Sequence, residues 1–298
     1  MAGEVATSRA GFEPKRRAFL TAEWRYLVML NYEVDPAVLH ALVPRHTVLD
    51  LWNGRAIASV VGFRFLRTRV LGAPIPLHRN FEEVNLRFYV RHTTSSGEVR
   101  RGVVFVRELV PKAAIALVAR LAYNEPYWAL PMRSTVPRAP VDHPGRVSYQ
   151  WRTGSRWQQL SAVAGGKPEL PASSSEESFI TEHFWGYTRQ RDGATVEYEV
   201  EHARWRVWTA TESSLDADVP RLYGSSFARP RGGPHLGVHR GGIARDGVPS
   251  PPTQRPRDGD RALVRTRYAR SYSSSSAFVV RSASRRRNPA TASFPAGT

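Results

Sequence analysis

Residues 80–109 have the sequence NFEEVNLRFYVRHTTSSGEVRRGVVFVREL, which is typical of a β-hairpin. Two runs rich in β-branched and aromatic residues flank TTSSG, whose small polar residues and glycine are typical of a turn. The pattern predicts an antiparallel hairpin with strands over residues 80–92 and 98–109. Residues 48–66 repeat the arrangement around Asn53-Gly54, a dipeptide that strongly favours a two-residue hairpin turn. Two successive hairpins indicate a mainly antiparallel sheet.

Further strand-like runs surround these hairpins. Residues 18–34 form one, and others lie at residues 147–163 and 185–211, the last turning at Asp192-Gly193. Helices are expected after Asp35-Pro36, over about residues 112–123, and from Ser174 or Ser175 onward, because these residues suit helix N-termini. Strands outnumber helices and are evenly spaced. The sequence therefore predicts a mainly β (α+β) fold, an antiparallel, closed or nearly closed barrel with a few peripheral helices.

Composition excludes several classes of protein. The 298-residue chain contains no cysteine, so disulfides, thiolate catalysis and cysteine-ligated zinc are ruled out. No apolar run approaches the roughly 18 residues that a membrane span needs. No apolar segment ahead of a cleavage site marks a secretory signal near the N-terminus. We therefore expect a cytoplasmic protein without a membrane partner.

Positive charge is concentrated towards the C-terminus. Residues 228–298 contain 14 arginines, no lysine and 3 aspartates, so they carry +11 of the net charge of +17. All eight tryptophans precede residue 228. Such a composition does not support a packed core. We expect a flexible N-terminus at residues 1–17, a folded domain at residues 18–227 and an Arg-rich, disordered tail at residues 228–298.

The tail has three interpretations. An arginine-rich arm can bind nucleic acid through phosphate contacts, although a solvated extension without a partner is favoured over it. The third interpretation is out-of-frame translation: a one-nucleotide shift after Phe227 would make residues 234–248 read as an apolar strand with a turn. In that case most of the tail is not native sequence.

Four segments occur in a characteristic order within residues 18–227. They are EWRYLVMLNYEVDPAVLHALVP, IPLHRNFEEVNLRFYVR, RGVVFVRELVPKAAIALVARLAYNEPYWALPMR and SFITEHFWGYTRQRDGATVEYEVEHARW. Their order resembles the YqjF-like domain of unknown function, whose fold is similar to that of acetoacetate decarboxylase. The resemblance implies an acetoacetate decarboxylase-like domain, a small-molecule ligand with a carboxylate or keto group, and no cofactor.

Lys112 is one of only three lysines among 43 basic residues. Lysine, unlike arginine, can lose its proton at a buried site and then act as a nucleophile. In the decarboxylases that the chain resembles, a lysine after a similar REL and proline motif forms a Schiff base with a β-keto acid, which implies that role for Lys112. A place in the first helical turn, near Arg107, would favour the neutral amine. Ala113 replaces the second lysine of those decarboxylases, and their glutamate before the IP motif is missing.

Glu82 and Glu83 complete the candidate catalytic set. They are neighbours on an expected strand, so one side chain should point into the fold and the other away from it. An inward carboxyl group could serve as an acid or base. The alternative is an ion pair with Arg64 or Arg107, the two arginines that we expect to hold a ligand carboxylate.

The remaining ligand-binding candidates are Glu108, Tyr187 and Trp128. Ligand cavities are mostly apolar and aromatic with a few polar groups, and these residue types fit that description. A metal site would require two distant pairs to meet, Glu182-His183 and Glu201-His202. Their spacing does not demand this, so no metal site is predicted.

The sequence supports two main hypotheses for function. One is a barrel that binds or acts on a small organic acid or keto compound, in the manner of a lyase or decarboxylase, by Schiff-base chemistry at Lys112. The other is a non-catalytic small-molecule-binding or structural barrel, which the departures from the decarboxylase pattern favour. Nucleic-acid binding through the tail is a weaker third, and a homo-oligomer remains open.

Overall fold

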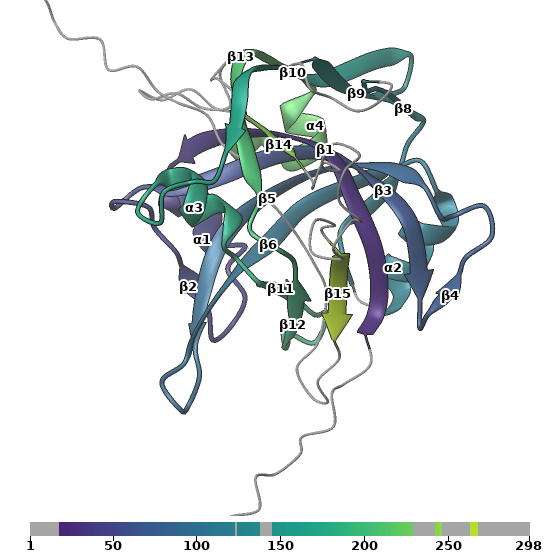
Figure 1. The fold of residues 1–298 in the computed structure, drawn as a ribbon. Coiled ribbons are helices and arrows are strands. Elements are labelled where there is room, and N and C mark those ends of the chain that lie inside the picture. Colours follow the sequence, from purple (N-terminus) through teal and green to yellow (C-terminus); the bar gives the residue numbers. More distant parts are fainter. Residues whose placement is uncertain (1–17, 123, 138–144, 229–241, 246–262, 268–298) are drawn as a thin grey trace, which may run out of the picture.

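The computed structural model describes residues 18–122, 124–137, 145–228, 242–245 and 263–267 (Figure 1). The first strands are β1 (Ala18–Val34), β2 (Val48–Leu49), β3 (Ala56–Val70), β4 (Ala73–Pro74), β5 (Phe81–Thr93), β6 (Val99–Val110) and β7 (Tyr127–Ala129). The others are β8 (Met132–Thr135), β9 (Arg146–Thr153), β10 (Arg156–Glu169), β11 (Trp185–Arg189), β12 (Thr195–Glu201), β13 (Arg206–Asp216), β14 (Gly242–Arg245) and β15 (Leu263–Arg267). The helices are α1 (Pro36–His40), α2 (Ala113–Ala122), α3 (Glu176–Thr181), α4 (Val219–Tyr223) and the 3-10 helix η1 (Ser225–Phe227).

The strands form one strongly curved sheet. Its order is β4-β3-β5-β6-β11-β12-β15-β1-β14-β13-β10-β9-β8, with β2 added to β5, β7 added to β6, and a further pairing between β3 and β1. Most pairings are antiparallel, and β6 pairs in parallel with β7 and β11. The mainly β class with a few peripheral helices is confirmed. A closed barrel is not supported, because β4 and β8 remain as the two ends of the hydrogen-bonded path.

The hairpin at residues 80–109 forms as predicted. β5 and β6 pair in antiparallel fashion up to Thr93 and Val99, and the turn between them is closed by a bond from the Gly97 N–H to the Thr94 carbonyl. Gly97 has a φ of 84°, a conformation that glycine adopts without strain. This hairpin supplies the central strands on which the functional site is built.

The hairpin expected at residues 48–66 is only partly correct. Asn53 and Gly54 both have positive φ, as the predicted tight turn requires, but only Trp52 and Arg55 bridge across it. β2 pairs with β5 rather than with β3. The cause is Asp50, whose N–H donates to the Tyr89 carbonyl and whose carboxylate accepts a bond from Arg101 at 2.6 Å. These contacts hold the segment against β5 and β6.

Helix starts follow the expected capping chemistry. Asp35 accepts a hydrogen bond from the Ala37 N–H at 2.9 Å and Pro36 occupies the first position of α1. Ser175 accepts from the Ser178 N–H at 3.2 Å at the start of α3. Of the two serines considered for that cap, the second is therefore the one used.

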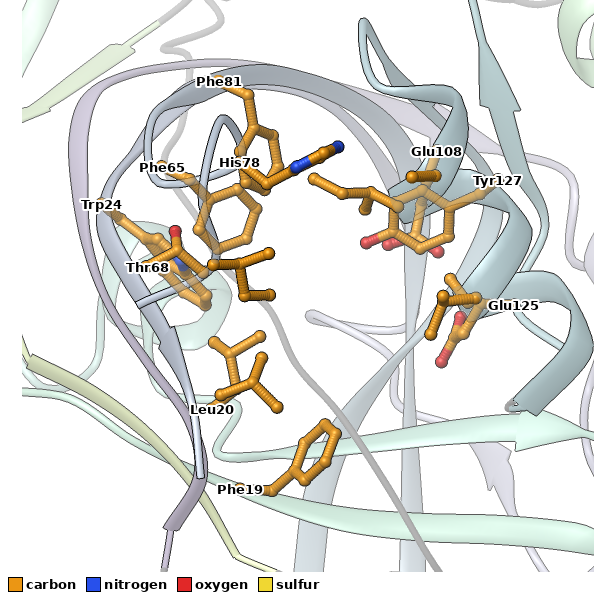
Figure 2. Close-up of a pocket in the computed structure, with 16 residues that line it drawn as sticks. Phe19, Leu20, Trp24, Phe65, Thr68, His78, Phe81, Glu108, Glu125 and Tyr127 are labelled. Atoms are coloured by element: carbon orange, nitrogen blue, oxygen red, sulfur yellow. The ribbon is translucent and has the colours of Figure 1, made fainter. Parts of the chain in front are cut away.

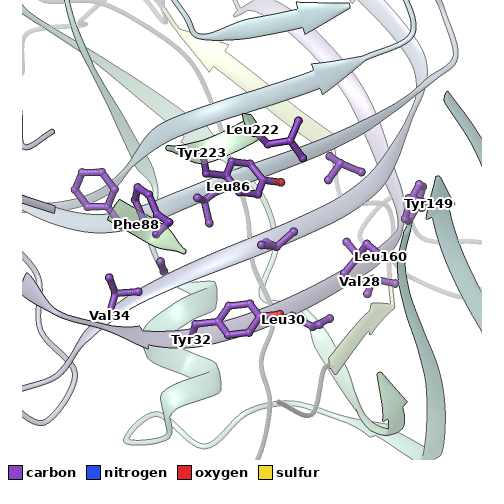
Figure 3. Close-up of a cluster of buried hydrophobic side chains, with 14 of the residues drawn as sticks. Val28, Leu30, Tyr32, Val34, Leu86, Phe88, Tyr149, Leu160, Leu222 and Tyr223 are labelled. Atoms are coloured by element: carbon purple, nitrogen blue, oxygen red, sulfur yellow. The ribbon is translucent and has the colours of Figure 1, made fainter. Parts of the chain in front are cut away.

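The buried side chains form two clusters. One packs between β1, β3 and β5 on one side and β9, β10 and α4 on the other, and includes Val28, Tyr32, Leu86, Tyr149 and Leu222 (Figure 3). The second includes Trp24, Phe63, Phe65, Phe81 and Phe179, with Ile115 of α2 packed against it. β5 contributes alternate residues to both clusters. Both of its faces are therefore covered, which makes polar residues on this strand unusual.

Two short strands lie within the segment expected as a tail. β14 pairs with β1 and β13, and β15 pairs with β1 and β12. The rest of the predicted tail, and the predicted flexible N-terminus at residues 1–17, lie outside the described residues. Within the described ranges, no helix is long and apolar enough to cross a membrane.

Candidate functional site: an apolar cavity with buried carboxyl groups

A cavity of about 290 Å³ lies between β1, β3, β6 and α2. Its walls are mainly apolar and aromatic. Figure 2 shows Trp24, Phe65 and Thr68 on one side, facing Glu108, Tyr127 and Glu125 on the other. This combination of apolar walls and a few polar groups is typical of small-molecule sites, and the volume is at the lower end of the ~300–1,000 Å³ that such sites occupy.

Three glutamates gather beside this cavity, and we call Glu83, Glu108 and Glu125 the carboxyl cluster. Glu108 and Glu125 line the cavity and are 2% and 5% exposed. Glu83 lies behind Tyr127, whose hydroxyl donates to its Oε2 at 3.1 Å. Thr188 donates to Glu125 Oε1 at 2.7 Å. The cluster is therefore held by hydrogen bonds from β7 and β11.

A β-bulge aims Glu108 into the cavity. Leu86 is paired with Arg107, and Arg87 is paired with Phe105, so Val106 is an extra residue in β6. The bulge reverses the alternation of side chains along β6. Without it, Glu108 would face the opposite cluster, because strand residues alternate between the two faces. The bulge thus turns Glu108 towards the cavity.

The face of β5 nearest the cavity carries a polar stripe. Glu83, Asn85 and Arg87 occupy alternate positions and are each almost fully buried. Asn85 donates to Glu83 Oε1 at 2.9 Å, and the guanidinium of Arg87 interacts electrostatically with Glu83. Arg87 also lies over the ring of Tyr89, 5.8 Å from its centroid. This buried cation partly compensates the charge of Glu83.

Burial controls the acidity of the carboxyl cluster. Desolvation raises the pKa of Glu83 to about 7 although hydrogen bonds from Asn85 and Tyr127 oppose it. Desolvation likewise raises the pKa of Glu125 to about 7. The pKa of Glu108 lies well above its ordinary value, because burial is reinforced by repulsion from Glu125 and Glu83. At neutral pH the cluster therefore holds at least one proton beside ionised carboxylate.

Glu108 and Glu125 interact with each other within the cluster, and each influences the pKa of the other. Glu108 Oε2 and Glu125 Oε2 have no donor from any other described group. A protonated carboxyl next to an ionised one can donate a proton and accept one at the same pH. The arrangement suits acid–base chemistry on a molecule in the cavity.

The two candidate glutamates of β5 point to opposite sides. Glu83 belongs to the carboxyl cluster, whereas Glu82 accepts a hydrogen bond from Ser134 at 2.8 Å. Arg64 lies beside Glu82, with 3.7 Å between Arg64 Nε and Glu82 Oε1. Neither Glu82 nor Arg64 lines the cavity. The expected alternation along the strand is therefore observed.

Other sequence candidates lie away from the cavity. Arg107 stacks on Trp128, 4.1 Å from its ring centroid, and donates to the Leu222 carbonyl at 3.1 Å. Tyr187 is buried, and its hydroxyl donates to Glu197 Oε2 at 3.1 Å. Arg107, Trp128 and Tyr187 pack beside the first hydrophobic cluster, on the other face of the sheet. Of the ligand-binding candidates, Glu108 is the one that reaches the cavity.

Lys112 directly precedes α2. Its carbonyl accepts the first helical hydrogen bond, from the Ala116 N–H at 3.1 Å, so it occupies the N-cap position rather than the expected first turn. Its side chain is partly exposed and is not among the residues that line the cavity. Ala114, Ile115, Val118 and Ala119 of the following helix do line it.

The Glu-His pairs considered for a metal do not meet. His183 is fully buried and bonds through Nε2 to Asp50 at 3.1 Å, and Glu182 pairs with Arg204. Burial lowers the pKa of His183 to about 4, so it is neutral at pH 7. Among the described residues, no group of three or more potential ligands is placed to hold a metal ion.

Sequence reasoning missed Glu125 and Tyr127, although both fall within the NEPYW stretch. A glutamate and a tyrosine directly after an apolar helix are typical of a polar loop, so their types gave no sign of a site. Their partners Glu108 and Glu83 lie on β6 and β5, so only the fold brings the four together. An acid between apolar neighbours, as in VRELV, is the signal that would have pointed to Glu108.

A family model of uncharacterized conserved proteins, DUF2071, matches residues 21–241 of the chain. The chain belongs to the DUF2071 family. Uncharacterized protein YqjF of Bacillus subtilis is 26% identical over 190 residues, which cover 63% of this chain and 74% of YqjF. The YqjF-like resemblance predicted from the four sequence segments is thus confirmed.

Solved structures show the same fold as this DUF2071 member. The acetoacetate decarboxylase of Legionella pneumophila has a TM-score of 0.51 at 11% identity, covering 90% of this chain and 96% of that one. The enduracididine biosynthesis enzyme MppR, solved with pyruvate, has a TM-score of 0.53 at 12% identity, covering 90% and 97%. An acetoacetate decarboxylase-like enzyme from Sphingomonas wittichii has a TM-score of 0.52 at 14% identity, covering 90% of this chain and 98% of that one. The likeness is one of fold.

Proposed function

We propose that this DUF2071 protein binds a small, largely apolar organic molecule in the cavity and acts on it by acid–base chemistry through Glu108 and Glu125. The observation that carries the proposal is the position of these two buried carboxyl groups, which line an apolar cavity and whose pKa values are raised by burial. Similarity in fold to proteins that handle small carbonyl compounds, such as MppR with pyruvate, supports a small-molecule ligand.

A ligand screen tests the proposal. The full chain is mixed with alcohols, ketones, amines and carboxylic acids of up to about ten heavy atoms, and binding is followed by ligand-detected NMR. We expect compounds that bind in wild type to lose affinity in Glu108→Gln and Glu125→Gln. Glu82→Gln is the matched control, because Glu82 lies on the same strand as Glu83 but pairs with Arg64 outside the cavity.

Acid–base action has its own readout. For each compound that binds, exchange of carbon-bound hydrogen with D₂O is followed by NMR, and both carboxyl variants should abolish it. Binding without such exchange would reduce the function to ligand binding, the non-catalytic alternative. The proposal is wrong if no compound binds, or if ligands bind Glu108→Gln and Glu125→Gln as tightly as they bind wild type.

Schiff-base chemistry at Lys112 is a second candidate. It is supported by the place of Lys112 directly before α2, four of whose residues form a wall of the cavity. A keto group suits this chemistry better than a ligand carboxylate, which would meet two buried carboxyl groups. Borohydride reduction with β-keto acids and aldehydes, followed by intact-protein mass spectrometry, should give an adduct that Lys112→Ala lacks. The absence of any adduct would rule the candidate out.

A further inference from the structure

The cavity presents carboxyl groups and aromatic rings. Among the described residues that line it, none is an arginine or lysine, and the polar groups are Glu108, Glu125, Thr68, Tyr127, His78 and the indole of Trp24. Arg87, the buried cation of the region, is not one of the lining residues. A ligand carboxylate would therefore meet two acids without a lining cation to compensate them.

Buried polar atoms without a partner lie on both walls of the cavity. Glu108 Oε2 and Glu125 Oε2 are buried and have no hydrogen-bond partner among the described groups. On the facing wall, Thr68 is 3% exposed and its hydroxyl has no hydrogen-bond partner among the described groups. Buried polar groups are normally paired by hydrogen bonds, so we expect a bound ligand to pair with these atoms on both walls of the cavity.

The aromatic wall suits the same kind of ligand. Trp24 packs with Phe63 and Phe65, at ring-centroid distances of 5.4 Å and 5.9 Å, and Phe81 packs on Phe65 at 4.7 Å. Trp24, Phe65 and Phe81 line the cavity, and a cation placed over the face of such a ring is attracted by its quadrupole. Carboxyl groups opposite aromatic rings therefore form a setting that stabilises positive charge.

We propose that the cavity selects a small apolar amine, bound as its ammonium ion between Glu108 and Glu125. The proposal rests on the proposed binding in the cavity, and it does not require the acid–base step. The ammonium takes the place of protons held by the two carboxyl groups: one cation enters, at least one proton leaves to solvent, and the N–H groups of the ammonium donate to both carboxylates. Ligands with a carboxylate in the same place are excluded.

Three probes that share one ring test this. Benzylamine, benzyl alcohol and benzoate are titrated into the full chain by calorimetry at pH 6 and pH 7, in two buffers with different ionisation enthalpies. We expect benzylamine to bind best, with release of at least one proton per site. Its affinity should rise by roughly tenfold or more between pH 6 and pH 7, because at least one proton is displaced. Benzyl alcohol should bind weakly and benzoate not at all.

Variants confirm the location. Glu108→Gln and Glu125→Gln should each weaken benzylamine binding at least tenfold and weaken benzyl alcohol binding much less, whereas Glu82→Gln should bind both like wild type. The proposal would be overturned if benzoate bound as tightly as benzylamine, or if benzylamine bound without releasing a proton. Benzyl alcohol binding as tightly as benzylamine would overturn it and leave the proposed function standing. If none of the three binds, the amine proposal fails, and the wider screen judges the proposed function separately.

Discussion

Glu83, Glu108 and Glu125 are all buried, and one buried guanidinium, that of Arg87, interacts with the cluster. Three ionised carboxylates cannot be stable there, because each loses its hydration and repels the others. The fold relieves this by keeping protons on the cluster at neutral pH. The same protons give the site its chemistry. Stability and function are therefore opposed at these residues.

Glu125→Gln should change how stability depends on pH. Burial raises the folded-state pKa of Glu125 from 4.5 to about 7. Below about pH 4.5 the group is protonated in both the folded and the unfolded chain, so it costs nothing. As pH rises towards and through 7, the folded state must ionise a buried carboxyl that the unfolded chain ionises freely, and stability falls by up to about 3 kcal/mol.

Glutamine removes this loss, and its amide oxygen can still accept from Thr188. Thermal unfolding from pH 5 to pH 8 should show wild type losing stability relative to Glu125→Gln, with the two similar at pH 5. Glu82→Gln should follow wild type throughout. If Glu125→Gln were less stable than wild type by the same amount at every pH, the raised folded-state pKa of Glu125 would be contradicted.

At the scale of elements, local signals in the sequence predicted the hairpin of β5 and β6, the Asp192-Gly193 turn and the helix caps. Each depends on residues that are adjacent in the chain. Gly193 indeed has a φ of 81°, and the Ala194 N–H donates to Asp192 at 2.9 Å. Features of this kind are decided before distant segments meet, so they can be read from sequence.

The bulge in β6 and the pairing of β2 could not be predicted in this way. Val106 does not differ from its neighbours in residue type, so nothing local marks it as the extra residue. β5 alternates Val84, Leu86 and Phe88 with Glu83, Asn85 and Arg87, which is typical of a strand with one wet face. The structure buries both faces, because segments from distant parts of the chain cover the polar one. The site therefore follows from tertiary packing.

α2 is the element that should govern access to the cavity. Ala119 lines the cavity and Leu117, 57% exposed, does not. We expect Ala119→Phe to occupy part of the cavity and lower ligand affinity at least tenfold with little change in unfolding temperature. Leu117→Phe adds a ring to the same helix outside the cavity and should leave affinity unchanged. Ligand titrations and thermal unfolding of both variants check this, and equal effects on affinity would contradict it.

For the whole molecule, the boundary expected at Phe227 divides a continuous sheet. β14 pairs with Leu27–Met29 of β1 and with β13, and β15 pairs with residues 18–23 of β1. A chain that ends at Phe227 would leave backbone groups of β1 unpaired. The unfolding temperature should therefore fall by about 5 °C or more, since each kcal/mol corresponds to about 2–4 °C at this size.

A chain that ends at Arg267 is the control, because it keeps both strands. An unchanged unfolding temperature for the shorter chain would show that β14 and β15 add no stability. The same two chains test nucleic-acid binding: loss of affinity for duplex DNA with an unchanged fold would support that interpretation of the tail. Sequencing the encoding DNA tests the frame-shift interpretation, which an uninterrupted frame at Phe227 would contradict.

The contrast between a chain with a net charge of +17 and a cavity lined by acids has a kinetic consequence. At a distance, an ammonium ion meets a positive field, and only inside the cavity does the sign reverse. Added salt screens the distant field far more than the buried one. Stopped-flow measurements should therefore show an amine entering faster as ionic strength rises, the reverse of a ligand that is guided to its site by long-range attraction. The surface of this protein would act as a barrier to the very ligand that its interior retains.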